Sequence, residues 1–322
     1  MLSRGAVGFV ANPASGKDIR RVTARASVFD NQEKSAMVRR CLIGLRAMSD
    51  APIRYLADAN RLVESALEEL GFDADAVDVE TNGSAADTTQ AAAALRGAGA
   101  VVTLGGDGTN RAFAKGWLDA PLIPLSTGTN NAFPVMREAT TAGAAAGLLV
   151  SRAIPLEAVA ERAKVIHVDI DREAADIALI DAVLTADRFI GARALDDPGK
   201  LIAAMLTRAD PAGVGMTSIG GFTRPLAARA DAALIIDFDA SSPHRVVAAL
   251  APGRFESIGL ARTRTAELGE PLHLTGPGVL ALDGERERVL GPGQAATLRT
   301  LRDGPWVVDV RSVLTRVGCV GR

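Results

Sequence analysis

The chain has 322 residues, about twice the ~150 residues of a typical domain, so two domains are expected. Its 48% hydrophobic and 23% charged residues exclude a disordered chain, and a formal net charge of -2 argues against a protein built to bind nucleic acid or an anionic membrane. The two cysteines, Cys41 and Cys319, show no CxxC spacing, and no apolar run reaches the ~20 residues of a spanning helix. We therefore expect a cytoplasmic protein without a disulfide framework, a structural zinc site or a membrane span.

The first half of the chain alternates short apolar runs with helical patterns. The run at residues 6–11 predicts a buried strand that ends at Asn12 and Pro13. Further strands are predicted over residues 53–57, 77–80, 100–104 and 121–125, and helices over residues 18–26, 32–48, 58–71, 84–96, 109–116 and 137–150. This alternation is typical of a doubly wound parallel sheet with helices on both faces.

The pattern changes near residue 152, where periodic helices give way to strands and Gly/Pro turns. Strands are predicted over residues 164–169, 178–185, 233–238, 254–260, 272–274 and 279–282, with one helix at residues 199–209. We therefore divide the chain into an α/β domain at residues 1–151 and a mainly β domain at residues 152–300. Residues 301–322 are expected to return to the first domain.

A glycine-rich segment, LGGDGTNR at residues 104–111, follows an apolar strand and opens a helix. Ligands of open α/β sheets bind beyond the carboxyl ends of the strands, and glycines let backbone amides approach a polyphosphate there. The carboxylate of Asp107 would lie among the phosphates, where it could orient Mg²⁺ or accept a proton from an attacking hydroxyl. The alternative is a tight turn in which Asp107 only caps the helix.

Two other polar segments also follow strands. The first, NPASGK at residues 12–17, offers a hydroxyl, a free amide and a cation, although it is not a P-loop and alone is typical of an ordinary strand-to-helix turn. The second, STGTNN at residues 126–131, offers small polar side chains. Because all three segments end predicted strands, we expect them to converge on one crevice.

These three segments together resemble the NAD kinase / diacylglycerol kinase superfamily, and the resemblance covers nearly the whole chain. The segments with the residues around them are most similar to the ATP-NAD kinase-like branch, which includes AcoX-type proteins of acetoin catabolism. The resemblance implies a Rossmann-like nucleotide domain, a sandwich-like β domain and a site between them. It implies a catalytic role for Asp107 at the acceptor hydroxyl. It also implies phosphate or nucleotide contacts for Asn12, Ser15, Gly16, Lys17, Gly105, Gly106, Gly108, Thr109, Asn110, Thr127, Gly128, Thr129, Asn130, Asn131 and Asp181.

The resemblance further implies ATP, NAD and Mg²⁺ as cofactors, nucleotide substrates, and a homo-oligomer, either a dimer or a tetramer. The segment LDGE at residues 282–285 is similar to the lipid-kinase branch, in which Asp283 and Glu285 would help place Mg²⁺. The alternative interpretation of this segment is a β-turn. On the helix after the glycine segment, Arg111 and Lys115 lie four residues apart, and we expect Arg111 to reach a phosphate and Lys115 to face solvent.

The sequence leaves three functions open. The first is a kinase that phosphorylates the 2′-OH of NAD with ATP and so contributes to NADP biosynthesis. The second is a kinase for a lipid or another hydroxyl compound. The third is a nucleotide-binding sensor that transfers no phosphate, and it is favoured by Ile180, which stands where NAD kinases carry Asn, and by residues 214–222, which only partly match the T-P-T-G-S-T-A-Y segment.

Overall fold

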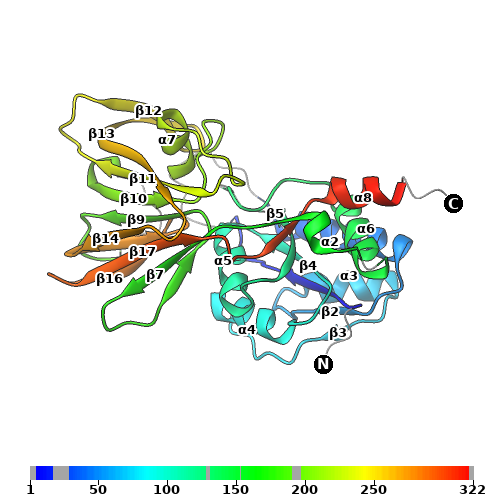
Figure 1. Cartoon of the computed structure of the whole chain (residues 1–322). Helices are drawn as coiled ribbons and strands as arrows, with labels where there is room; N and C mark the ends of the chain where they lie inside the picture. The colour runs from blue at the N-terminus through cyan, green and yellow to red at the C-terminus, as the bar shows by residue number, and fades with distance from the viewer. Residues whose placement is uncertain (1–4, 17–28, 128–130, 153, 191–196, 319–322) are drawn as a thin grey trace.

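The computed structural model describes residues 5–16, 29–127, 131–152, 154–190 and 197–318 (Figure 1). Its first sheet has the strand order β3-β2-β1-β4-β5-β18-β6, in which all pairs are parallel except β18 with β6. The strands are β1 (Val7–Ala11), β2 (Ile53–Tyr55), β3 (Asp75–Ala76), β4 (Ala100–Gly105), β5 (Pro121–Ser126), β6 (Ala160–Arg162) and β18 (Trp306–Val308). The predicted doubly wound sheet is confirmed.

Helices cover both faces of this sheet because its central strands are apolar on both sides. In β1, Phe9 packs into one core and Val10 into the other. On the Phe9 side lie α2 (Asn31–Met48), α3 (Leu62–Leu70), α6 (Ala139–Ser151) and α8 (Val310–Gly318), and on the Val10 side lie α4 (Ala85–Ala94) and α5 (Asp107–Gly116). None of the described helices is both long and apolar enough to cross a bilayer.

Local sequence signals set several helix ends and contacts. The side chain of Asp30 accepts a hydrogen bond from the Glu33 amide at the start of α2, as an N-cap does. Helix α3 ends at Gly71, which has a φ of 65°. Helices α2 and α6 approach so closely that a Cβ at Gly143 would lie 1.8 Å from the Cys41 carbonyl oxygen. Glycine is therefore required at this contact.

The second half of the chain forms two antiparallel sheets that pack face to face. Their strand orders are β12-β13-β11-β10-β9-β15-β16 and β14-β17-β7-β8. The strands are β7 (Val165–Ile170), β8 (Asp176–Ala178), β9 (Asp181–Thr185), β10 (Leu201–Leu206), β11 (Ala232–Phe238), β12 (Arg245–Ala251), β13 (Arg254–Glu267), β14 (Pro271–Thr275), β15 (Gly278–Leu282), β16 (Glu285–Leu290) and β17 (Ala295–Leu301). Short 3₁₀ turns occur at Leu156–Ala158 and Pro198–Lys200, and α7 (Met216–Thr223) covers the outer face of the larger sheet.

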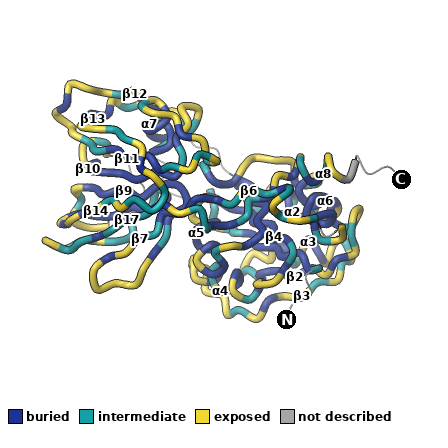
Figure 2. Tube along the Cα trace, in the orientation of Figure 1, coloured by how far each residue is buried: buried dark blue, intermediate teal, exposed yellow. Residues whose placement is uncertain are grey.

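The buried residues lie between these layers of sheets and helices. Figure 2 shows buried chain along the strands of both halves and exposed chain mainly at hairpins and outer loops. Side chains of the larger sheet alternate between two cores: Met205 packs against the smaller sheet, and Leu206 packs toward α7. Strand β18 then pairs with β5, so the chain returns to the first sheet before α8.

The helix predicted at residues 199–209 is wrong, because residues 201–206 form β10 and the helix of this region is α7. Strand β10 is buried on both faces, and a short apolar run of that kind cannot be distinguished from a buried helix by periodicity. The strand predicted at residues 178–185 is interrupted between β8 and β9 by Leu179 and Ile180. The helix predicted at residues 18–26 lies outside the described residues.

Candidate active site

Three polar loops meet at the carboxyl ends of β1, β4 and β5, which are neighbours in the first sheet. The side-chain amide of Asn12 donates to the Thr109 hydroxyl at 2.8 Å, and the hydroxyls of Ser15 and Thr127 lie 2.7 Å apart. The backbone N–H of Thr127 donates to the Gly105 carbonyl at 3.1 Å. The structure therefore brings together residues that are far apart in the chain, since Ser15 and Thr127 are separated by 112 positions.

The glycine loop is packed tightly on the first turn of α5. A Cβ at Gly105 would lie 2.4 Å from the Thr109 side chain, so only glycine fits there. Asn110 is fully buried, and its side chain accepts from the Thr103 hydroxyl at 2.7 Å and donates to the Gly106 carbonyl at 2.9 Å. Asn110 therefore stabilises the glycine loop from its buried side, and the glycines form the outer surface of the loop.

Asp107 begins α5 and points its carboxylate at the third loop. Its two oxygens accept hydrogen bonds from the backbone amides of Ala132 and Phe133, at 2.8 to 3.1 Å. Burial, the largest effect, raises the pKa of Asp107 to about 7, and the negative charge of Asp283 also raises it. The hydrogen bonds from the Phe133 and Ala132 amides and the positive charge of Arg208 lower this pKa, but by less. A carboxyl with this pKa exchanges protons near neutral pH, which suits a general base.

A pocket of about 40 Å³ opens beside Asp107, between the first sheet and the antiparallel sheets. The acids Asp107, Asp181 and Asp283 and the apolar residues Ile180, Met216 and Leu250 are among the residues that line it. Asp181 and Ile180 thus reach the same pocket as the glycine loop.

The Asp283-Gly284 pair forms the two-residue turn between β15 and β16, with φ angles of 50° and 78°. Positive φ at both positions is typical of a tight hairpin turn, as the alternative interpretation of this segment expects. The Asp283 carboxylate accepts from the amides of Leu179 at 3.0 Å and Ile180 at 2.7 Å, and it is buried. Asp283 therefore stabilises the short connection between β8 and β9, which places Ile180 and Asp181 at the pocket.

The described residues contain no group of three or more His, Cys, Asp or Glu side chains placed to hold a metal ion. Mg²⁺ in phosphoryl-transfer sites is usually bound by one or two carboxylates together with waters and substrate phosphates. Glu285 fits this arrangement, because its Oε1 would be 3.6 Å from a Cβ placed on Gly108, at the open side of the glycine loop. The donor set therefore suits magnesium that arrives with a nucleotide, and the magnesium roles of Asp283 and Glu285 stay predictions.

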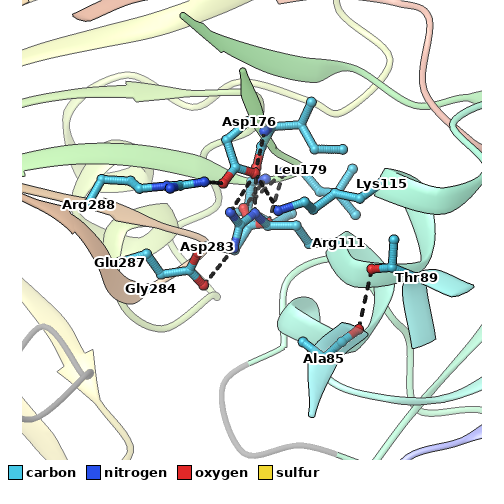
Figure 3. A network of polar contacts seen from close by, with 12 residues as sticks. Ala85, Thr89, Arg111, Lys115, Asp176, Leu179, Asp283, Gly284, Glu287 and Arg288 are labelled. Atoms are coloured by element: carbon cyan, nitrogen blue, oxygen red, sulfur yellow. Dashed lines mark hydrogen bonds and ion pairs between the residues drawn. The ribbon is translucent and has the colours of Figure 1, made fainter. Parts of the chain in front are cut away.

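A salt-bridge network joins α5 to the antiparallel sheets (Figure 3). Asp176 of β8, whose side chain is fully buried, binds Arg111 at 2.9 Å, Lys115 at 3.0 Å and Arg288 at 2.8 Å. Arg111 also binds Glu287 at 2.7 Å. Although burial opposes ionisation, Arg111 and the other two cations hold the pKa of Asp176 far below its usual range.

The network corrects one expectation from the sequence. Arg111 does not reach toward the three polar loops, since its side chain is 6% exposed and is bonded to Asp176 and Glu287. Lys115 is exposed, as expected, and its ammonium also binds the Asp176 carboxylate. Both side chains fix the orientation of the helix that begins at Asp107.

Four predicted contact residues, Lys17, Gly128, Thr129 and Asn130, lie outside the described residues. Asn131 is described, and its side-chain amide donates to the Ser126 hydroxyl within the third loop.

Sequence reasoning missed Lys34. This residue of α2 is fully buried, and its ammonium donates to the carbonyls of Asn12 at 3.2 Å, Pro13 at 2.9 Å and Ser15 at 2.7 Å. In a trans peptide the N–H points opposite to the C=O, so the Ser15 carbonyl bond turns the Gly16 N–H away from Lys34. The signal in the sequence is a lysine on the helix face that also carries Met37, Val38 and Cys41.

We expect Lys34→Met to loosen the first loop. Leaving three carbonyls without their buried donor should lower the free energy of unfolding by about 1–3 kcal/mol. The dissociation constant of MgATP, measured by calorimetry, should rise about tenfold or more because the loop loses its shape. The control is Lys200→Met, which removes a lysine whose side chain is 47% exposed. An unchanged MgATP affinity in a folded Lys34→Met protein would contradict a role for Lys34 in shaping this loop for a nucleotide.

Sequence reasoning also missed Arg208, which follows β10. Its guanidinium donates to the Ala132 carbonyl at 2.8 Å and lies 5.6 Å from the centre of the Phe133 ring. No short motif marks it, because its partners are about 76 residues away in the chain.

Comparisons with known proteins agree with this architecture. Two family models match the chain: the ATP-NAD kinase N-terminal domain at residues 7–153, and the Acetoin catabolism protein X C-terminal domain at residues 164–303. The acetoin catabolism protein X of Cupriavidus necator is 35% identical over 331 residues, which cover 97% of this chain and 92% of that protein.

Solved structures share the fold at low sequence identity. Yeast NADH kinase complexed with NADH matches with a TM-score of 0.53 and 13% identity, over 98% of this chain and 88% of the kinase. A protein from Bacillus anthracis str. Sterne assigned to the diacylglycerol kinases matches with a TM-score of 0.52 and 13% identity, over 95% of this chain and 97% of that protein. At these identities the likeness concerns the fold alone.

Proposed function

The chain belongs to the acetoin catabolism protein X family, with an NAD kinase-type first domain, and we propose that it is an ATP-dependent small-molecule kinase. One observation carries the proposal. Asp107, whose carboxylate is held by two backbone amides, belongs to one of the three polar loops and lines the adjoining pocket. A polar rim for phosphates and a carboxylate facing an adjoining pocket are the two parts that phosphoryl transfer to a hydroxyl requires.

In the proposed reaction, the acceptor hydroxyl enters the pocket and its oxygen attacks the γ-phosphorus of ATP. The new O–P bond forms as the bond to the β-γ bridging oxygen breaks, and the electron pair leaves with ADP. Asp107 orients the hydroxyl and takes its proton. The amides of the glycine loop and the N-terminus of α5 stabilise the phosphate charge. Magnesium, when bound with ATP, would neutralise phosphate charge, and Glu285 is the carboxylate placed to help hold it.

We propose the 2′-OH of NAD as the first acceptor to test, with NADP as the product, because the first domain matches the ATP-NAD kinase model. A coupled assay for NADP formation, run with ATP and magnesium, tests this acceptor directly. Calorimetry with ATP, NAD and NADP gives the affinities in parallel. Transfer from γ-labelled ATP to lipids or other hydroxyl compounds, without NADP formation, would identify a kinase with a different acceptor. We also propose a homo-oligomer, which light scattering coupled to gel filtration tests.

A nucleotide sensor is the second candidate, and Ile180 favours it. Ile180 is among the residues that line the pocket and stands where NAD kinases carry an asparagine, so this position offers no side-chain hydrogen-bonding group to a dinucleotide. Tight binding of ATP or NAD with no transfer to any acceptor would favour the sensor over the kinase.

The pH dependence of the proposed reaction follows from Asp107. Because the base form is the ionised carboxylate and burial raises the pKa of Asp107 to about 7, kcat should increase as the pH rises through about 7. The free energy of unfolding should show the opposite trend. The raised pKa stabilises the folded protein below the unfolded pKa of 3.8, and this contribution is lost as the pH rises toward 7.

Rate measurements between about pH 5.5 and 9 check this prediction. Since product release can mask chemistry, single-turnover rates should accompany kcat. A single-turnover rate that is flat across this range would contradict proton transfer to Asp107.

A further inference from the structure

Arg208 connects the antiparallel half of the molecule to the turn that holds Asp107. The guanidinium Nη1 donates to the Ala132 carbonyl at 2.8 Å, and the guanidinium carbon lies 5.6 Å from the centre of the Phe133 ring. The backbone amides of the same two residues donate to Asp107. Arg208 therefore binds one side of the Ala132-Phe133 turn while Asp107 binds the other.

We propose that Arg208 is a positioning residue for phosphoryl transfer, which holds the Ala132-Phe133 turn so that its two amides fix the Asp107 carboxylate at the pocket. The proposal rests on the proposed kinase function, because it assigns a role relative to the reacting carboxylate. It also makes the site depend on both halves of the chain, since Arg208 follows β10 and the turn follows β5. A shift of one half against the other would then change the orientation of Asp107.

The surroundings of Arg208 are unfavourable for a purely structural side chain. Its Nε is buried and has no hydrogen-bond partner, and no ion pair between Arg208 and an acid occurs among the described residues. A buried donor without a partner costs stability, and an aliphatic side chain could pack on Phe133 without this cost. What the guanidinium adds over an aliphatic side chain at this position is its hydrogen bond to the Ala132 carbonyl and its positive charge.

Charge near the pocket indicates what the cation contributes. The acids Asp107, Asp181 and Asp283 line the pocket, and Glu285 lies near the glycine loop. Arg111 of α5 is bonded to Asp176 and Glu287, and Lys115 of the same helix is bonded to Asp176. The positive charge of Arg208 lowers the pKa of Asp107, against the larger effect of burial. The hydrogen bond of Arg208 to the Ala132-Phe133 turn and its positive charge thus both act on the Asp107 carboxylate.

Hydrogen exchange measures the positioning role without relying on activity. In the wild-type protein, the amides of Ala132 and Phe133 should be protected because they are bonded to Asp107. In Arg208→Met, both amides should exchange at least tenfold faster, while amides in the centre of β10 and β5 keep their rates. Arg208→Lys keeps the charge and one donor, so it should restore part of the protection.

Arg162→Met is the matched control. Arg162 also stacks on an aromatic ring, at 5.7 Å from the centre of Trp306, donates to a backbone carbonyl, that of Asp303, and has a buried Nε without a partner. Its loss should leave the Ala132 and Phe133 amides protected. If Arg208→Met does not fold, Arg208→Leu, which also lacks a donor for the Ala132 carbonyl, takes its place. Unchanged protection in a folded Arg208→Met or Arg208→Leu protein would overturn the proposal.

Kinetics then separate positioning from binding. We expect Arg208→Met to lower kcat at least tenfold with little change in the KM for ATP, and Arg208→Lys to recover part of kcat. A rise in the KM for ATP at wild-type kcat would overturn the positioning role. If the wild-type protein transfers phosphate to no acceptor, the proposed kinase function fails, and the exchange rates still report whether Arg208 holds the turn.

Discussion

Replacing Asp107 by asparagine should lower kcat for phosphoryl transfer by a factor of roughly 10²–10⁴, the usual contribution of a positioned general base. Asparagine has nearly the same shape, and its side-chain oxygen can still accept from the amides of Ala132 and Phe133. The fold and the affinity for MgATP should therefore persist. Only the ability to take a proton from the acceptor is lost. Transfer from γ-labelled ATP gives the rate, and calorimetry gives the affinity.

Asp239→Asn is the matched control for this substitution. Asp239 also accepts a hydrogen bond from a backbone amide, that of Ser241 at 2.8 Å, but it does so in an exposed turn and does not line the pocket. Its replacement should leave kcat unchanged. Turnover of Asp107→Asn at the wild-type rate would remove Asp107 from the chemistry.

Asp176→Asn should produce the largest loss of stability. The substitution leaves Arg111, which is 6% exposed, with only Glu287 as an acidic partner, and breaking a buried charge pair in this way costs about 3–5 kcal/mol. Because the three cations lower the pKa of Asp176, its contribution is present above the unfolded pKa of 3.8 and is lost as the pH falls through the lower folded value. Chemical denaturation at neutral pH measures the difference in the free energy of unfolding.

An exposed ion pair provides the comparison. Asp169 lies 3.4 Å from Arg299, with side chains 59% and 43% exposed, so Asp169→Asn should change the free energy of unfolding by less than about 1 kcal/mol. Equal denaturation midpoints for Asp176→Asn and the wild-type protein would contradict the role of the network in joining α5 to the antiparallel sheets.

The parallel sheet and its three loops were predictable from the sequence because short local sequence patterns indicate both. An apolar run followed by small polar residues marks the end of a buried strand, and parallel strands bring such ends to one edge. The segments before Asn12, Asp107 and Thr127 show this pattern, and these residues lie within one connected set of contacts in the structure.

The supports of the site were not predictable in the same way. Lys34, Asp176 and Arg208 act on residues that are distant in the chain. Asp176 and Arg208 look like ordinary surface residues in a single sequence, and the position of Lys34 on an apolar helix face does not reveal its partners. Strand β10 was mistaken for a helix because its alanines and leucines favour helices, while burial on both faces of a central strand decided the outcome. Distant contacts therefore carry the information that local patterns lack.

A crystal structure with a non-hydrolysable ATP analogue and magnesium tests the central claim most directly. We predict that the triphosphate lies along the three loops, with its γ-phosphate at the glycine loop and facing the Asp107 carboxylate across the mouth of the pocket. A nucleotide bound elsewhere on the molecule, or one whose γ-phosphate points away from Asp107, would contradict the account.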